Sequence, residues 1–251
     1  MAVGGTISSL VSWGGLFLAY AGSGAAITIV LIATSRRLSG ELSSDPNSRV
    51  VKPYIELLSH LPSLKAYLIV FFEGMLILGS FSYLGAAISN TFNYSYITIG
   101  AITTAFGIGA ILAGRLGGRI VKRTGKKRLI AFGLLFGAVA DLLMATLSAS
   151  LMSTIIGVFL LGLGFMLAHS TLLTLATEFA KKSRGIAMSL VAFSFMVGGA
   201  VGTGLGGGYI NAYGYESFFL ICSVLLVTLG LIAYIAISEG ALLKEEEELA
   251  M

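Results

Sequence analysis

Three ionisable side chains lie well inside long apolar runs of this 251-residue sequence, namely Glu73, Asp141 and His169. A carboxylate and an imidazole are side chains that exchange protons in function, and together they can also hold a cationic ligand. Charged groups are costly in hydrocarbon, so an ionisable residue at such a position indicates a functional site by default. We therefore take Glu73 and His169 as candidates for a proton or substrate pathway.

The two candidates are expected at a similar depth. Glu73 follows Lys65 by about eight residues, roughly 12 Å along a helix, and His169 precedes Glu178 by about nine residues, roughly 13 Å. The polar residues that share a face with one of them at helical spacing are Ser80, Tyr83, Ser170, Thr174 and Thr177. A purely structural role stays open, because polar side chains between membrane helices often only hydrogen-bond across a bundle, for about 1 kcal/mol each.

The elements that carry these residues are apolar helices. Hydrophobic residues make up 56% of the chain, charged residues 11%, and the mean hydropathy is +0.93, which excludes an ordinary soluble domain. Since about 20 apolar residues cross a bilayer as a helix, the sequence predicts an all-α, polytopic membrane bundle of about seven transmembrane helices. The expected spans are 13–34, 66–90, 95–115, 129–149, 152–177, 186–210 and 216–238.

The basic residues set the orientation. All 16 Lys and Arg residues lie in segments 36–65, 115–128 and 181–184 and at Lys244. Cytoplasmic loops carry an excess of Lys and Arg, so these segments are expected inside and the loops 91–94, 150–151 and 211–215 outside. The sequence therefore predicts an integral protein of the cell (plasma) membrane with a cytoplasmic C-terminus. Because the net charge of +4 gathers at the ends of apolar runs, nucleic acid is not an expected partner.

Prolines divide the chain into domains. All three, Pro46, Pro53 and Pro62, fall between Ser35 and Lys65, where prolines favour turns over helix interiors. The predicted division is the end of an N-terminal bundle at 1–34, a cytoplasmic linker at 35–65, a six-helix bundle at 66–238 and an acidic cytoplasmic tail at 239–251.

One polar loop carries a motif. Residues 118–128 read GRIVKRTGKKR, with Gly118 expected to permit close helix approach and Gly125 a tight turn. This loop resembles the cytoplasmic loop motif of the major facilitator superfamily, G-x-L-x-D-R-x-G-R-R, in its C-terminal copy. The residues taken as this conformational motif are Gly118, Lys122, Arg123, Gly125, Lys126, Lys127 and Arg128. Lys122 occupies the family's acidic position, so a charge lock through that residue is not expected.

Two further stretches resemble the drug:proton antiporter and arabinose-efflux-permease-like branch of that superfamily. They are Phe72-Glu73-Gly74 with Tyr83-Leu84-Gly85, and His169-Ser170-Thr171 with Met188-Ser189-Leu190. The resemblance implies that the helices carrying Glu73 and His169 line a central cavity. It also implies that Asp141 lies at the periphery, so that pairing with the basic loop or with another helix is expected for Asp141. Glu178 is expected in an interfacial ion pair, because Lys181, Lys182 and Arg184 follow it closely in the sequence.

Glycines crowd one predicted helix. Gly198, Gly202 and Gly206 follow small-xxx-small spacing, which predicts close packing against a neighbouring helix. In a transporter this contact would also let helices move during alternating access, whereas a static contact is an equal alternative.

The expected function is transport. Motifs for zinc, phosphate loops and serine hydrolases are missing from the sequence, so an enzyme, a cofactor and a metal site are not expected. The resemblance implies proton-coupled efflux of small molecules by alternating access, with lipid, substrate and protons as partners. Against a twelve-helix family pattern the chain supplies the last seven helices, so a missing N-terminal half is a further expected partner. The alternative is a truncated or split-gene product that acts only as a membrane interaction module.

Overall fold

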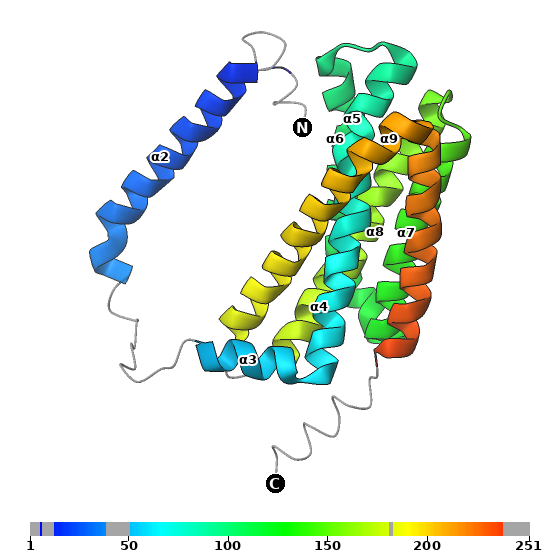
Figure 1. Cartoon of the computed structure of the whole chain (residues 1–251). Helices are drawn as coiled ribbons and strands as arrows, with labels where there is room; N and C mark the ends of the chain where they lie inside the picture. The colour runs from blue at the N-terminus through cyan, green and yellow to red at the C-terminus, as the bar shows by residue number, and fades with distance from the viewer. Residues whose placement is uncertain (1–5, 7–12, 39–50, 181–182, 238–251) are drawn as a thin grey trace.

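The chain is an all-α membrane bundle (Figure 1). It was analysed as a computed structural model, which describes residues 6, 13–38, 51–180 and 183–237. The expected stub before residue 13 and the acidic tail at 239–251 fall almost entirely outside these residues. The helices are α2 (Trp13–Leu38), α3 (Val51–Ser59), α4 (Leu61–Glu73), the π-helix η2 (Gly74–Leu78), α5 (Gly79–Phe92), α6 (Tyr96–Thr124), α7 (Lys126–Thr146), α8 (Leu151–Glu178) and α9 (Arg184–Ala236).

Six helices in the described residues are long and apolar enough to cross a membrane. One of them is the continuous run formed by α4, η2 and α5, and another is α9. The chain reverses within α9 at Gly214, whose φ of 82° is a conformation that glycine adopts without strain. Counting 184–213 and 215–236 separately gives seven segments, as the hydropathy pattern predicts.

Local hydrogen bonds and backbone conformations explain where the helices begin and end in the turns that are expected outside the cell. The turn before α6 contains Asn93 in the left-handed conformation (φ 56°), and Ser95 then caps the helix by accepting a hydrogen bond from the Thr98 amide. Ser150 caps α8 in the same way through the Ser153 amide. The described turns at this end of the bundle, 93–95, 147–150 and Gly214, contain no Lys or Arg.

The packed core joins α4 through α9. Helix α8 lies between α6 and α7, while α9 packs against α7 with its second segment and against α4, η2 and α5 with its first. Leu134, Leu161, Leu172 and Leu226 are fully buried where these helices meet. Lipid tails are as apolar as leucine, so close packing rather than transfer from water holds such helices together.

The glycines on α9 lie in this close packing. A Cβ atom added to Gly198 would meet the backbone of Phe71 and Met75, and one added to Gly202 would meet the Met75 carbonyl. One added to Gly206 would meet the ring of Tyr83. The three positions singled out from the sequence therefore face α4, η2 and α5 without room for a side chain.

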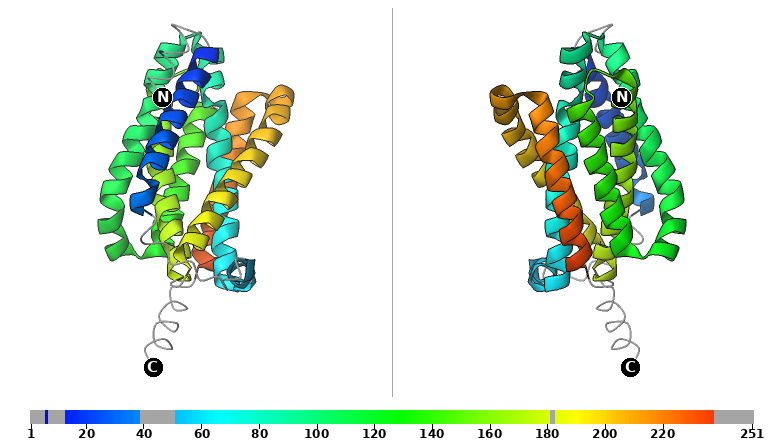
Figure 2. Two further views of the ribbon diagram at one scale, coloured as in Figure 1. Left: turned by 90° about the vertical axis from the view of Figure 1, so that its left-hand side faces the viewer. Right: turned by 90° about the vertical axis from the view of Figure 1, so that its right-hand side faces the viewer.

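Helix α2 stands apart from the bundle in Figure 1, and the side views of Figure 2 draw it in front of and behind the other helices. The side chains described along it are almost all exposed, including the large apolar residues Phe17, Leu18 and Ile29. Side chains of this kind suit lipid or other membrane helices, so α2 belongs to the membrane without belonging to the packed core.

The expected linker is partly helical. Helix α3 lies across the end of the bundle, and α4 begins at Leu61 instead of residue 66 (Figure 1). Pro53 and Pro62 fit because each lies in a helix's first turn, where the missing N–H removes no intrahelical bond. The third proline, Pro46, is outside the described residues. Leu57 of α3 is buried against the bundle.

Candidate functional site

The structure brings Glu73 and His169 into contact. Glu73 is the last residue of α4, and its Oε2 lies 3.0 Å from Nδ1 of His169 on α8. The Glu73 side chain is 0% exposed, while that of His169 is 20% exposed. The contact therefore joins a buried carboxyl group to an imidazole that reaches the surface of the bundle. Its proton lies on either partner, since a carboxylate accepts from Nδ1–H and a carboxylic acid donates to Nδ1.

Aromatic rings surround the imidazole. Phe165, one turn earlier on α8, stacks on His169 with ring centroids 5.1 Å apart, and Phe195 of α9 lies at 4.7 Å. Phe165 also contacts Phe195. These apolar neighbours exclude water from one side of the pair and hold the ring toward Glu73. The second carboxyl oxygen of Glu73, Oε1, has no hydrogen-bond partner in the described residues, so the site can accept a further donor.

A π-helix begins immediately after Glu73. Its i→i+5 pattern adds one residue to a turn, and π-turns inside membrane or soluble helices are frequent at functional sites. Later residues are therefore displaced by about 100° from where regular α-helical spacing puts them. Ser80, expected on the face of Glu73, is fully buried like Glu73 and lies beside Asp141 of α7.

Tyr83 also lies apart from the pair. Its hydroxyl donates to the backbone carbonyl of Thr203 on α9, and its ring contacts Phe218 edge-on with centroids 5.5 Å apart. Tyr83 therefore joins α5 to both segments of α9.

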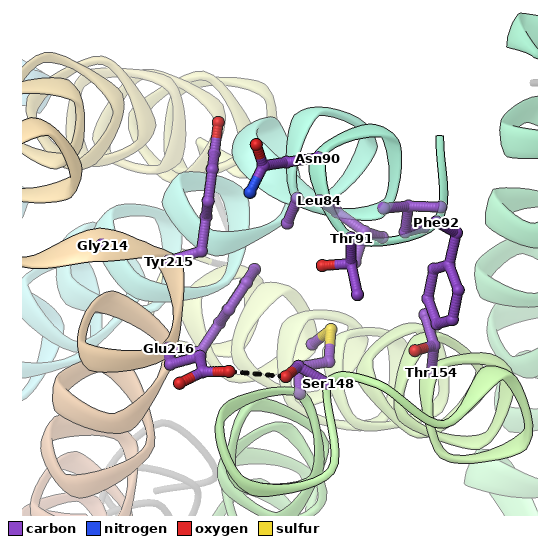
Figure 3. A pocket seen from close by; sticks show the side chains of 13 residues that line it. Leu84, Asn90, Thr91, Phe92, Ser148, Thr154, Gly214, Tyr215 and Glu216 are labelled. Atoms are coloured by element: carbon purple, nitrogen blue, oxygen red, sulfur yellow. Dashed lines mark hydrogen bonds between the residues drawn. The ribbon is translucent and has the colours of Figure 1, made fainter. Parts of the chain in front are cut away.

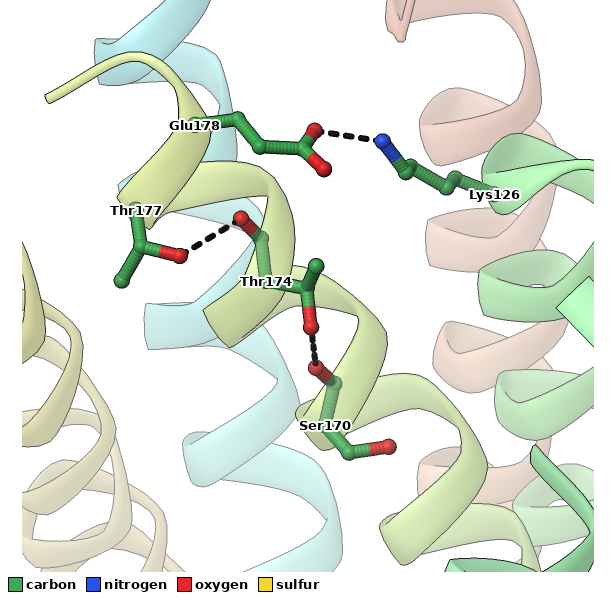
Figure 4. Close-up of polar contacts among 5 residues, drawn as sticks. All are labelled: Lys126, Ser170, Thr174, Thr177 and Glu178. Atoms are coloured by element: carbon green, nitrogen blue, oxygen red, sulfur yellow. Dashed lines mark hydrogen bonds and ion pairs between the residues drawn. The ribbon is translucent and has the colours of Figure 1, made fainter. Parts of the chain in front are cut away.

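Thr174 lies on an exposed polar face of α8 (Figure 4). Its hydroxyl donates to the Ser170 carbonyl at 2.8 Å, and Thr177 donates to the Thr174 carbonyl at 2.8 Å. These bonds satisfy the hydroxyl protons inside the helix and leave oxygen lone pairs free to accept hydrogen bonds. The face begins one residue after His169 and runs to the end of α8.

The loop motif is mostly helical. Helix α6 continues to Thr124, and the chain turns at Gly125 with φ 81°, as expected for that glycine. The expectation for Gly118 is wrong within the described residues, because a Cβ atom there would meet nothing within 4 Å. Lys127 lies over the ring of Tyr234 at 4.8 Å. Lys122, Arg123 and Arg128 point outward with exposed side chains.

Glu178 forms an ion pair, as expected, but its partner is Lys126 at the start of α7 (Figure 4). The pair with Arg184 is not formed, and Lys181 and Lys182 lie outside the described residues. The motif thus supplies a cation to the end of α8, although its acidic position is a lysine. Chain proximity favoured Arg184, but the reversal of the chain at Gly125 places Lys126 closer.

Asp141 has no ion-pair partner among the described residues, contrary to the expectation. It is fully buried on α7, and neither carboxyl oxygen has a hydrogen-bond partner of normal geometry. The nearby Ser80 hydroxyl donates to the Ile77 carbonyl at 3.2 Å. The sequence shows the depth of Asp141 but carries no signal for what surrounds it.

Two contacts of the site were not anticipated from the sequence. Phe165 and Phe195 were not singled out, although an aromatic residue four positions before His169 is a signal for stacking on one helix face. The aromatic partner on α9 and the π-helix had no such signal. Within the described residues, no group of three or more His, Cys, Asp or Glu side chains forms a metal site.

Comparisons with known proteins agree with this architecture. A family profile described as Major Facilitator Superfamily matches residues 66–248. An uncharacterized MFS-type transporter, YwfA, of Bacillus subtilis (strain 168) is 29% identical over 169 residues, which are 66% of this chain. The aligned chain spans 40% of that relative's length.

Proposed function

This chain belongs to the major facilitator superfamily, and on that premise we propose that it forms the C-terminal helical bundle of a membrane transporter for small molecules. A second helical bundle completes the carrier, which works by alternating access across the plasma membrane. The greater length of the relative supports a second bundle. So does α2, because its exposed apolar side chains suit contact with lipid or with other helices. The C-terminus lies in the cytoplasm, with the basic turns.

Proton coupling rests on one observation, the contact between Glu73 of α4 and His169 of α8 inside an apolar bundle. Intramembrane ionisable residues that pair with one another mark proton relays and ion pathways. When Glu73 is ionised, Nδ1–H of His169 donates to Oε2 and holds α4 against α8. A proton delivered through the exposed edge of His169 to the carboxylate changes that charge-assisted bond into a weaker neutral one.

The coupling step follows from that difference in bond strength. The free oxygen Oε1 of Glu73 accepts a donor from substrate or water when the two helices separate. The glycine contact between α9 and the α4–η2 segment lies beside the Glu73–His169 pair and allows these helices to slide. The polar face of α8 supplies hydrogen-bond acceptors to a substrate. Efflux is the direction that the branch resemblance favours.

The test is proton-driven efflux of amphipathic dyes from vesicles holding the chain, alone and with a second bundle expressed in trans. Glu73→Gln keeps a hydrogen-bonding side chain at the same place but cannot exchange a proton. We expect it to reduce gradient-driven efflux by at least about a hundredfold, the lower end of the usual range for losing a proton-transfer group. The matched control is Glu56→Gln, because Glu56 is an exposed carboxylate of α3.

Full activity of Glu73→Gln would remove Glu73 from the proton path. Equal loss in the Glu56 control would show that charge number, rather than position, decides the effect. Absence of efflux from every folded preparation would favour the alternative, a membrane interaction module without transport.

A further inference from the structure

A pocket opens at the end of the bundle that lacks basic residues (Figure 3). It lies among the end of α5, the turn between α7 and α8, and the reversal at Gly214, with a cavity volume of about 260 Å³. Leu84 is one of its lining residues and lies eleven positions after Glu73, about 16 Å along a helix. The pocket is therefore separate from the Glu73–His169 contact and shares no residue with it.

Its charge is negative. Glu216 is the one charged side chain among the lining residues, and the Ser148 hydroxyl donates to its Oε1 at 2.7 Å. The bond fixes the carboxylate at the pocket's edge and leaves Oε2 for another donor. Glu216 also lies in the first turn of the second segment of α9, whose N-terminus carries about half a positive charge. A full negative charge beside half a positive one leaves the site net negative.

Two more polar side chains line the pocket. Asn90 and Thr91 at the end of α5 lie across the same space as Glu216 (Figure 3). An amide oxygen and a hydroxyl oxygen both accept hydrogen bonds. Together with Glu216 they supply three acceptors from two elements.

The floor is apolar. Leu84, Met144 and Phe219 line the pocket and are buried in the core cluster. Ligand pockets commonly enclose about 300–1,000 Å³, so a cavity just below that range suits a small ligand with a short apolar part. A polar rim with one negative charge above an apolar floor is complementary to an amphipathic cation.

We propose that this pocket binds the ammonium group of a small primary alkylamine, with Glu216 as its counter-charge. A primary ammonium has three N–H donors, which match the acceptors of Glu216, Asn90 and Thr91. The alkyl part lies on the floor formed by Leu84, Met144 and Phe219. The same chemistry comes from a soluble amine or from the headgroup of an aminophospholipid at the membrane surface, and the experiment below separates the two.

The test is isothermal titration of n-butylamine into the full chain in phosphatidylcholine nanodiscs at neutral pH. We expect saturable binding that Glu216→Gln weakens at least about tenfold, since a charge-assisted hydrogen bond is lost. Asn90→Ala, an exposed position, weakens it less, and Glu56→Gln at the other end of the bundle leaves it unchanged. Butanol, which lacks the charge, and butyltrimethylammonium, which lacks the donors, bind more weakly than n-butylamine.

Nanodiscs that contain phosphatidylethanolamine show whether the ammonium group comes from a lipid headgroup or from a soluble amine. A lower apparent affinity for n-butylamine there, absent in Glu216→Gln, supports the lipid headgroup, while an unchanged affinity supports a soluble amine. The proposal is overturned if n-butylamine shows no saturable binding to folded protein, or binds equally to wild type and Glu216→Gln. Circular dichroism checks folding, and if Glu216→Gln does not fold, equal binding of the three ligands or an unchanged Asn90→Ala affinity overturns it instead.

Discussion

At the scale of single residues, the pair formed by Glu73 and His169 joins a fully buried carboxyl group to a single partner in the described residues. Each side chain satisfies part of the other, and the carboxyl group has no other hydrogen-bond partner in the described residues. Breaking a buried pair by removing one member leaves an uncompensated polar group, which is more harmful than losing the pair as a whole.

His169→Ala is therefore expected to destabilise the protein by about 3–5 kcal/mol, because Glu73 is left buried without a partner. The double substitution Glu73→Gln with His169→Ala should be less destabilised than the sum of the two single changes, since the residues are coupled. The measurement is the unfolding free energy in detergent micelles, with Thr174→Ala as an exposed control on the same helix. Additive effects would contradict the coupling.

Asp141 gives the opposite expectation. It is buried, and among the described residues neither carboxyl oxygen has a hydrogen-bond partner of normal geometry, so an apolar side chain of similar shape removes a buried unsatisfied group. Asp141→Leu should raise the unfolding free energy by about 1–3 kcal/mol. Ser223→Ala is the local comparison, because its hydroxyl donates to the Ala138 carbonyl at 2.8 Å and its loss should destabilise by about 1 kcal/mol. Destabilisation by Asp141→Leu would show that Asp141 has a partner.

Residue depth was predictable and residue pairing was not. Hydropathy alone placed Glu73, Asp141 and His169 inside the membrane, because an ionisable residue interrupts an apolar run visibly. Which of them meet depends on helix rotation and on chain reversals. Ser80 lies beside Asp141 of α7, and the turn at Gly125 gave Glu178 the partner Lys126 instead of Arg184.

At the scale of elements, the contact between α9 and the α4–η2 segment depends on the absence of side chains. Gly198→Ala and Gly202→Ala each place a Cβ atom against backbone of the neighbouring segment, which cannot give way as a flexible side chain can. We expect each to lower the unfolding free energy by about 1–3 kcal/mol, the usual effect of overpacking.

Gly204→Ala on the same helix is the matched control, since a Cβ atom there meets nothing within 4 Å. Alanine favours a helix over glycine by about 1 kcal/mol, so this control should be neutral or stabilising. Similar destabilisation by Gly202→Ala and Gly204→Ala would mean that glycine serves helix flexibility rather than close packing.

Elements were predictable where hydropathy changes sharply. The segments 96–124, 126–146 and 151–178 begin within about three residues of the expected spans, an ordinary uncertainty for element boundaries. Helix α6 runs further than expected because its basic end continues as helix up to the turn at Gly125. Helix α3 was missed because Pro53 and the polar residues before it resemble a linker, although a proline in a first turn is compatible with a helix.

At the scale of the whole molecule, orientation in the membrane decides which side each site serves. The turns with Lys and Arg lie at one end of the bundle and the Glu216 pocket lies at the other. Labelling of single introduced cysteines tests this orientation. The background is Cys222→Ala, which removes the one native cysteine, a buried side chain.

We expect a membrane-impermeant maleimide to label Ala149→Cys on intact cells, and Arg123→Cys only after the membrane is permeabilised. Both positions are exposed, and they lie at opposite ends of the bundle. A difference in labelling between them therefore reports which side of the membrane each one faces. The reverse result would place the basic turns outside, against the excess of Lys and Arg in cytoplasmic loops. Glu216 would then face the cytoplasm, and its pocket would bind amines from the cytoplasm instead of amines from outside the cell.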